Sequence, residues 1–141
     1  MTEWIIDKSA YEKLSKSPDI PEWTSRMRRG LVRVITPTLL ELGHSARNGL
    51  DWESRIANEP TNWLIVEDIE PDMERRALEV QRLLAMKGQH RAPSVVDLLV
   101  AAAAELHRLV VLHDDRDFDL IAGITGQKME RLRLLPMDDN G

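Results

Sequence analysis

Four acidic side chains lie where a charge is unexpected, and their chemistry is the first clue to function. Asp7 directly follows the apolar run WII, and Asp115 comes shortly after the apolar run LVVL. Glu41 and Asp97 lie within segments that are otherwise apolar enough for buried helices. A carboxylate on a buried face is costly unless it is paired or bound to a metal. Together the four residues predict a site for a divalent cation, provided that they meet at one end of one sheet.

Each of these acids also has a local interpretation that needs no metal. An acid before a helix can cap it, an acid in the first turn complements the helix dipole, and an acid elsewhere can pair with an arginine. The candidate partners are Ser9 for Asp7, Ser94 for Asp97, and Arg33 or Arg47 for Glu41, while Asp115 would only end a strand. The sequence leaves these interpretations open, but a cation explains all four acids at once.

An acidic run near the carboxyl end raises the same question. The stretch HDDRDFD carries Asp114, Asp115, Asp117 and Asp119 within a few residues. Like charges this close repel one another, and each favours water or a counter-charge. The run is either a solvent-facing cap or half of a cation site, and by itself it does not decide between them.

The residue types narrow the chemistry to oxygen ligands. The chain has no cysteine, and its histidines lack the paired spacing of a zinc site; His113, beside Asp114, is the one of interest. Carboxylates suit Mg²⁺, with Mn²⁺ as the alternative. Such an ion activates a bound water and neutralises a phosphate, which is the chemistry of phosphodiester hydrolysis. The segment GITGQK lacks the spacing of a phosphate-binding loop, and no GxSxG element is present.

Strand-like and helix-like segments alternate along the chain. Strands are expected at residues 4–6, 31–35, within 61–69, at 109–112 and near 129–134, and helices at 8–14, 21–29, 36–48, 51–59, 71–87, 95–109 and 117–122. Gly123 and Gly126 are expected to make turns. This order predicts the α/β class, as a three-layer α/β/α sandwich with a mostly parallel central sheet.

Length and composition bound the protein class. The 141 residues fit one compact domain, which we predict over residues 1–136, followed by a short flexible tail over 137–141. No apolar stretch is long enough to cross a bilayer, and MTEWIIDKSA does not have the form of a signal peptide. With cysteine absent as well, a cytoplasmic location without membrane attachment is expected.

The charge distribution leaves room for a nucleic-acid substrate. The net charge is −5, yet RMRRGLVR carries Arg26, Arg28, Arg29 and Arg33 with no acid among them. An acidic total with local basic segments is compatible with a metal-dependent enzyme that acts on phosphodiesters. The alternative is that these segments are solvated helix faces.

The order of these motifs resembles the PIN-domain ribonucleases, and within them the VapC-type toxins of bacterial toxin–antitoxin pairs. The elements that carry the resemblance are IIDKSA, ITPTLLELGHSAR, SVVDLLVAAAAELHRLVVLH and DRDFDLIA. They span nearly the whole chain, and their combination is more specific than any one of them. One departure is Lys8, which stands where the family commonly has threonine; it leaves the four acids intact.

The resemblance implies a role for each candidate residue. Asp7, Glu41, Asp97 and Asp115 would bind the metal and carry catalysis, while Ser9 and Asp117 would assist. Of the acidic run, Asp114 and Asp119 would be solvated or capping. The possible contacts to RNA phosphates are Lys8, Arg26, Arg28, Arg29 and Arg116.

The resemblance also implies a function and partners. The chain would be a Mg²⁺-dependent endoribonuclease, forming a homodimer with a PIN-like fold, and a VapB-type antitoxin would block its metal site. Residues 23–33 and 52–63 would offer partner or dimer surfaces, unless they serve only helix packing. Two alternatives remain: a different phosphodiester substrate such as DNA, or a non-catalytic interaction or receiver-like module with an acidic cation-binding crevice.

Overall fold

The computed structural model describes residues 1–136, and its centre is a parallel sheet of five strands. The strands are β1 (Trp4–Ile6), β2 (Val32–Ile35), β3 (Ile65–Glu67), β4 (Val110–His113) and β5 (Met129–Arg131). Their order in the sheet is β3-β2-β1-β4-β5, and every pairing is parallel. The chain therefore builds outward from β1 in one direction and, after β3, resumes on the other side of β1 with β4. The switch point of the topology lies between β1 and β4, where open α/β sheets place their ligand crevice.

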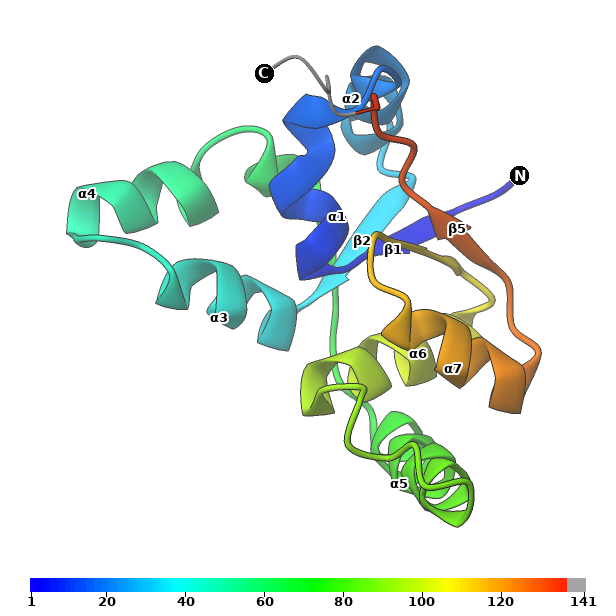
Figure 1. The fold of residues 1–141 in the computed structure, drawn as a ribbon. Helices are drawn as coiled ribbons and strands as arrows, with labels where there is room; N and C mark the ends of the chain where they lie inside the picture. Colours follow the sequence, from blue (N-terminus) through cyan, green and yellow to red (C-terminus); the bar gives the residue numbers. More distant parts are fainter. Residues whose placement is uncertain (137–141) are drawn as a thin grey trace.

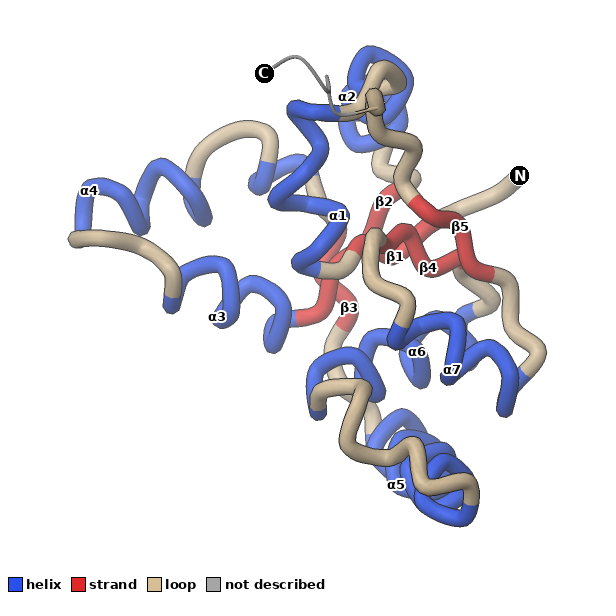
Figure 2. Tube along the Cα trace, viewed as in Figure 1, coloured by secondary structure: helices blue, strands red, loops and turns tan. Residues whose placement is uncertain are grey.

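Helices cover both faces of this sheet (Figure 1). They are α1 (Lys8–Lys13), α2 (Ile20–Arg28), α3 (Thr36–His44), α4 (Gly49–Trp52), α5 (Pro71–Met86), α6 (Val95–His107) and α7 (Asp117–Thr125). Trp4 and Ile6 of β1 pack in a core with side chains of α1 and α2, whereas Ile5 packs in a second core with α5, α6 and α7. This alternation is the period of a strand buried on both faces. Figure 2 shows the strands enclosed between helices, so the predicted three-layer sandwich is confirmed.

Helix α6 is the most deeply buried helix of the described chain. Its residues Ala101, Ala102, Ala103 and Ala104 are at most 3% exposed, and α6 contacts α5, α7, β1, β2 and β4. Small side chains let the helix lie close to its neighbours on several sides, which a close-packed interior requires. The position of α6, and with it the position of Asp97 in its first turn, is thereby fixed.

Two local predictions are wrong, one at Gly123 and one over residues 51–59. Gly123 makes no turn but lies inside α7, which continues to Thr125 and ends at Gly126 with a φ of +70°. Glycine is favoured at that left-handed position because it has no side chain to clash with the backbone. The predicted helix over residues 51–59 is instead α4 followed by a π-helical turn, Glu53–Ala57.

Two further sequence predictions concern a membrane span and the tail of the chain. Among residues 1–136, no helix combines the length and apolar character needed to cross a bilayer. The predicted tail over residues 137–141 lies outside the described residues, and the division of the chain into a domain and a tail stays a prediction.

The tight packing of α6 leads to a first prediction. Replacing Ala103 with leucine adds three carbon atoms where the exposed fraction is 0%, so the variant should lose about 1 to 3 kcal/mol of unfolding free energy. Urea unfolding followed by circular dichroism measures this loss. The control is Ala85→Leu on the exposed side of α5, which should change stability by less than about 0.5 kcal/mol. Equal effects for the two variants would contradict the packing described for α6.

Candidate metal centre

Acidic residues meet at the carboxyl ends of β1 and β4, beside the switch point of the sheet. Asp7 follows β1, and its amide donates to the carbonyl of Leu112 in β4 at 3.1 Å. Asp115 lies in the loop that leads from β4 to α7. The first turns of α6 and α7 add Asp97 and Asp117. The topology thus brings together residues from both ends of the sequence.

Three of these carboxylates form a compact cluster. Asp97, Asp115 and Asp117 each offer one oxygen, and the three oxygens lie within 4.8 Å of one another. Burial raises the pKa of Asp97, and the charges of Asp115 and Asp117 raise it further. Burial also raises the pKa of Asp117, with a further contribution from Asp115. Like charges held this close, with oxygen as the only donor, suit a hard divalent cation.

Asp117 also belongs to the compact cluster. The sequence predicts that it assists a metal or orients water, and its carboxylate oxygen lies close enough to those of Asp97 and Asp115 to share a cation. Its backbone amide donates to Oδ1 of Asp115 at 2.9 Å, so the two residues are fixed relative to each other. The spacing of two residues within DRD was the available signal.

Asp97 caps its own helix, as its local interpretation predicts. It forms a capping box with Ser94: the Asp97 amide donates to Ser94 Oγ, and the Ser94 amide donates to Asp97 Oδ2, each at 3.0 Å. Such reciprocal bonds satisfy two amides at the start of the helix. The local interpretation is therefore confirmed, but the same side chain also belongs to the cluster.

Asp7 is the most buried of these acids, with 3% of its surface exposed. It caps α1 by accepting from the amide of Ala10 at 2.9 Å, and it accepts from the Ser9 hydroxyl at 2.7 Å. Burial raises its pKa from 3.8 to about 6 against the effect of these bonds, and the charge of Asp97 adds to the increase. Asp7 lies outside the three-oxygen group, but it is electrostatically linked to it.

Ser9 joins α1 to the acidic run 105 positions further along the chain. Its hydroxyl oxygen accepts from the amide of Asp114 at 2.9 Å while its proton is directed to Asp7. Lys13 donates to Asp114 Oδ2 at 2.6 Å, and the Asp114 side chain is only 13% exposed. The expectation that Asp114 is solvated or capping is therefore wrong, because it is a half-buried ion-pair partner. Asp119 is exposed as expected and lies 3.4 Å from Arg131.

Glu41 lies to one side of the cluster, on α3. It lines a hollow together with Lys8, Pro37, Leu40, His44 and Val96. Since Lys8 and Val96 adjoin Asp7 and Asp97 in the sequence, this hollow is at the same end of the sheet. The proposed ion pairs of Glu41 are absent among the described residues, because Arg33 pairs with Glu3 and Glu67 and Arg47 pairs with Asp51. Glu41 therefore stays a predicted ligand outside the compact group.

The candidate phosphate contacts fall into two groups. Lys8 begins α1 and Arg116 precedes α7, so both adjoin the candidate metal centre. Arg26 lies 4.6 Å from the ring of Trp4 and 4.4 Å from that of Trp23, and Arg28 lies 4.6 Å from the ring of Trp63. With Arg29 they occupy the carboxyl end of α2, which leads to the amino end of β2. Contact with RNA stays a prediction for all five, and three lie away from the acids.

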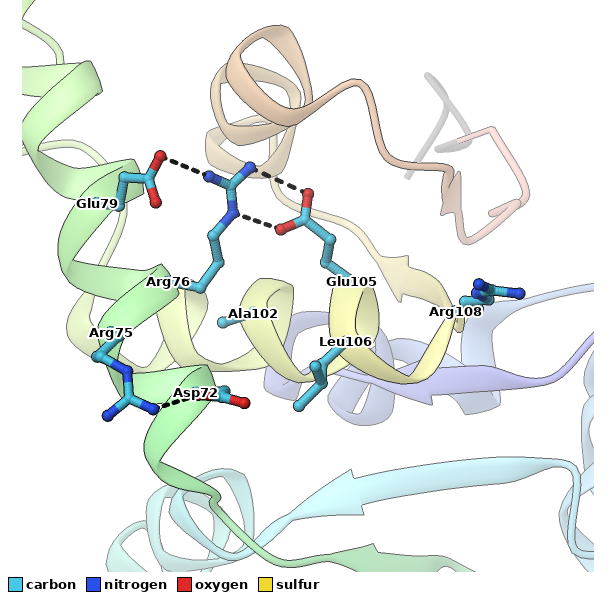
Figure 3. Close-up of a pocket in the computed structure, with 8 residues that line it drawn as sticks. All are labelled: Asp72, Arg75, Arg76, Glu79, Ala102, Glu105, Leu106 and Arg108. Carbon is cyan, nitrogen blue, oxygen red and sulfur yellow. Dashed lines mark hydrogen bonds and ion pairs between the residues drawn. The ribbon is translucent and has the colours of Figure 1, made fainter.

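The hollow between α5 and α6 is a different kind of surface. Figure 3 shows that most of its charged side chains are directed at one another: Arg76 lies between Glu79 and Glu105, and Arg75 reaches Asp72, while Arg108 stands apart. None of the acids considered above lines this hollow. Its charges are largely neutralised by one another, so it has no comparable capacity to hold a cation.

Comparison with known proteins identifies the family. The PIN domain matches residues 12–124, a range that includes Glu41, Asp97, Asp115 and Asp117. The chain is 51% identical to "Ribonuclease VapC2" of Mycobacterium tuberculosis (strain CDC 1551 / Oshkosh) over 94% of each protein. It is 41% identical to "Ribonuclease VapC51" of strain ATCC 25618 / H37Rv, over 89% of each. The chain belongs to the PIN domain family.

Solved structures share the fold at lower sequence identity. The DNA-bound VapBC of Salmonella typhimurium has a TM-score of 0.75 at 23% identity, with 93% of this chain and 98% of that chain covered. VapBC2 of Rickettsia felis, bound to a promoter DNA fragment, has a TM-score of 0.73 at 15% identity, with 92% and 98% covered. These structures share the fold, and the family match together with the relatives named above confirms the resemblance stated from the sequence.

The raised pKa of Asp7 predicts an effect of pH on stability. In the folded protein Asp7 binds a proton up to about pH 6, but in the unfolded chain only to 3.8, so its contribution to stability is lost as the pH rises between them. Asp7→Asn does not ionise. Its advantage over the wild type should therefore grow by about 2 kcal/mol between about pH 4.5 and about pH 8. Urea unfolding in EDTA measures this difference.

The control for Asp7→Asn is Asp68→Asn, which replaces an exposed loop carboxylate. Its difference from the wild type should not grow over the same pH range. A constant difference for Asp7→Asn as well would show that burial does not disfavour the charged form of Asp7.

Proposed function

We propose that this chain is a metal-dependent endoribonuclease that acts as the toxin of a toxin–antitoxin pair. The observation that carries the proposal is the convergence of Asp97, Asp115 and Asp117 at the switch point of a PIN-domain sheet. The relatives that match over most of the chain are named ribonucleases. Among the VapBC complexes that share the fold are complexes bound to DNA.

The donor set fits a cation of the Mg²⁺ type, with Mn²⁺ as the alternative. Every donor is a carboxylate oxygen, and the mutual repulsion that adds to the effect of burial in raising the pKa of Asp97 is relieved when a positive ion is bound. Asp97, Asp115 and Asp117 would hold the ion, with Asp7 and Glu41 completing the acidic surroundings. Such an ion lowers the pKa of a bound water and offsets the charge of the phosphate.

The protein residues would position the substrate and the ligands. Lys8 and Arg116 flank the cluster, so their side chains would attract the phosphates next to the scissile bond. Ser9 would keep the Asp7 carboxylate in place, because the Ser9 hydroxyl donates to that carboxylate and accepts from the backbone amide of Asp114. In this arrangement the carboxylates bind and orient, and no additional protein base is needed.

The partner of a toxin is a cognate antitoxin of the VapB type, and the substrate is RNA. Of the two segments predicted to contact a partner, residues 52–63 expose Trp52 at 43%, whereas Trp23 of the other segment is 2% exposed. We therefore favour residues 52–63 as the antitoxin contact. A homodimer remains part of the proposal.

The nuclease assignment predicts that the cluster acids are essential. Asp97→Asn and Asp115→Asn each remove a negative charge from the predicted ligand set, so cleavage of total cellular RNA with Mg²⁺ should fall by at least about a hundredfold. EDTA should abolish cleavage by the wild type. The matched control is Asp119→Asn, which removes an exposed carboxylate of the same acidic run and should leave the rate within about threefold.

The same experiment separates the alternatives. Full activity of Asp97→Asn and Asp115→Asn in folded protein would contradict the metal centre. Cleavage of DNA but not of RNA in a substrate panel would keep the centre and replace the substrate. Absence of both turnover and Mn²⁺ binding, in protein freed of antitoxin, would favour a non-catalytic interaction module.

A further inference from the structure

His113 is a buried polar residue at the end of an otherwise apolar strand. It is the last residue of β4, with 1% of its surface exposed. Its carbonyl accepts from the amide of Leu132 at 2.7 Å, so the backbone is held by the neighbouring strand region. The ring is therefore fixed in place.

The ring of His113 contacts both ends of the loop that carries the cluster acids. Its Nδ1 accepts from the backbone amide of Asp115 at 3.2 Å. Its face lies against Phe118, with ring centroids 5.0 Å apart and planes at 35°. Phe118 is fully buried and directly follows Asp117. The His113 ring thus contacts the backbone of Asp115 and the residue that follows Asp117.

The hydrogen bond fixes the protonation of the ring. Because the amide of Asp115 can only donate, Nδ1 presents a lone pair, and in a neutral imidazole the proton is then on Nε2. Asp115 is consequently held twice. Its amide is bound by His113, and its carboxylate Oδ1 accepts from the amide of Asp117 at 2.9 Å.

An apolar side chain would fill the same space but not make this bond. The rest of the strand end reads LVVL, and a leucine at position 113 would continue that pattern. It would leave the Asp115 amide without its acceptor in a half-buried loop, which is unfavourable and frees the loop to move. The acceptor atom, more than the volume of the ring, therefore distinguishes histidine here.

We propose that His113 is a positioning residue, which through Nδ1 holds the Asp115 amide and so places the Asp115 and Asp117 carboxylates for cation binding. This role rests on the proposed nuclease function, but it is also measurable without RNA. Groups that orient the ligands of a metal commonly change metal affinity by about tenfold to a hundredfold when they are removed.

The test compares His113→Leu with His113→Asn. The two replacements have nearly the same shape and both lack the ring that lies against Phe118, but Asn has an Oδ1 close to where Nδ1 lies. Mn²⁺ affinity is measured by calorimetry, and kcat and KM are measured with RNA. His113→Leu should lose at least about tenfold in Mn²⁺ affinity and in kcat at a similar KM, and His113→Asn should retain both within about threefold.

Equal losses in both variants, in step with their loss of thermal stability, would overturn the proposal and leave His113 as a packing residue. A measurement on the wild type covers the case in which His113→Leu does not fold. The ¹⁵N shifts of the metal-free protein should place the ring proton of His113 on Nε2, and a proton on Nδ1 would overturn the proposal. If Mn²⁺ binding responds as expected but no RNA is cut, the nuclease assignment fails while the positioning role stands.

Discussion

Electrostatic repulsion among half-buried carboxylates is the constraint on which the rest of this structure depends. Three oxygens from Asp97, Asp115 and Asp117 lie within 4.8 Å of one another. The charge of Asp97 also adds to the effect of burial in raising the pKa of Asp7. Hydrogen-bond donors of the backbone offset this repulsion. The helices α1, α6 and α7 begin beside the cluster, and the acids accept from amides at those beginnings. Because the amino end of a helix carries partial positive charge, this arrangement favours anionic side chains before any ion binds.

The parallel sheet and the small residues of α6 make this convergence possible. Parallel strands end at the same edge, so acids that follow β1 and β4 become neighbours although they are far apart in the sequence. The four alanines of α6 let that helix lie close to the sheet, and its first turn brings Asp97 to the same edge. Packing and chemistry are coupled here, since a bulkier α6 would displace a charge as well as strain the core.

The sequence was sufficient for the fold class and for much of the candidate site, because both leave local signatures. Strand runs followed by acids predicted Asp7 and Asp115, and a single charge in an apolar helix predicted Asp97. The spacing within DRD indicated Asp117, but its proximity to Asp97 depends on how α6 and α7 pack. The ion pair of Asp114 depends on how a loop folds back on α1, which neighbouring letters do not encode. The same reason explains the basic residues. The run RMRRGLVR suggested one surface, but the direction of α2 places its arginines against tryptophans at the other end of the sheet.

The pairing of β1 with β4 has a consequence for synthesis of the protein. Ile5 lies beside Val111, so the central contact of the sheet joins residues separated by most of the chain. A nascent polypeptide that has not yet released residues 110–117 from the ribosome contains Asp7 and Asp97 but lacks the loop that completes the cluster. Contacts this distant form late because a long loop must close first. Assembly of the carboxylate group is thus tied to the release of residues 110–117 from the ribosome.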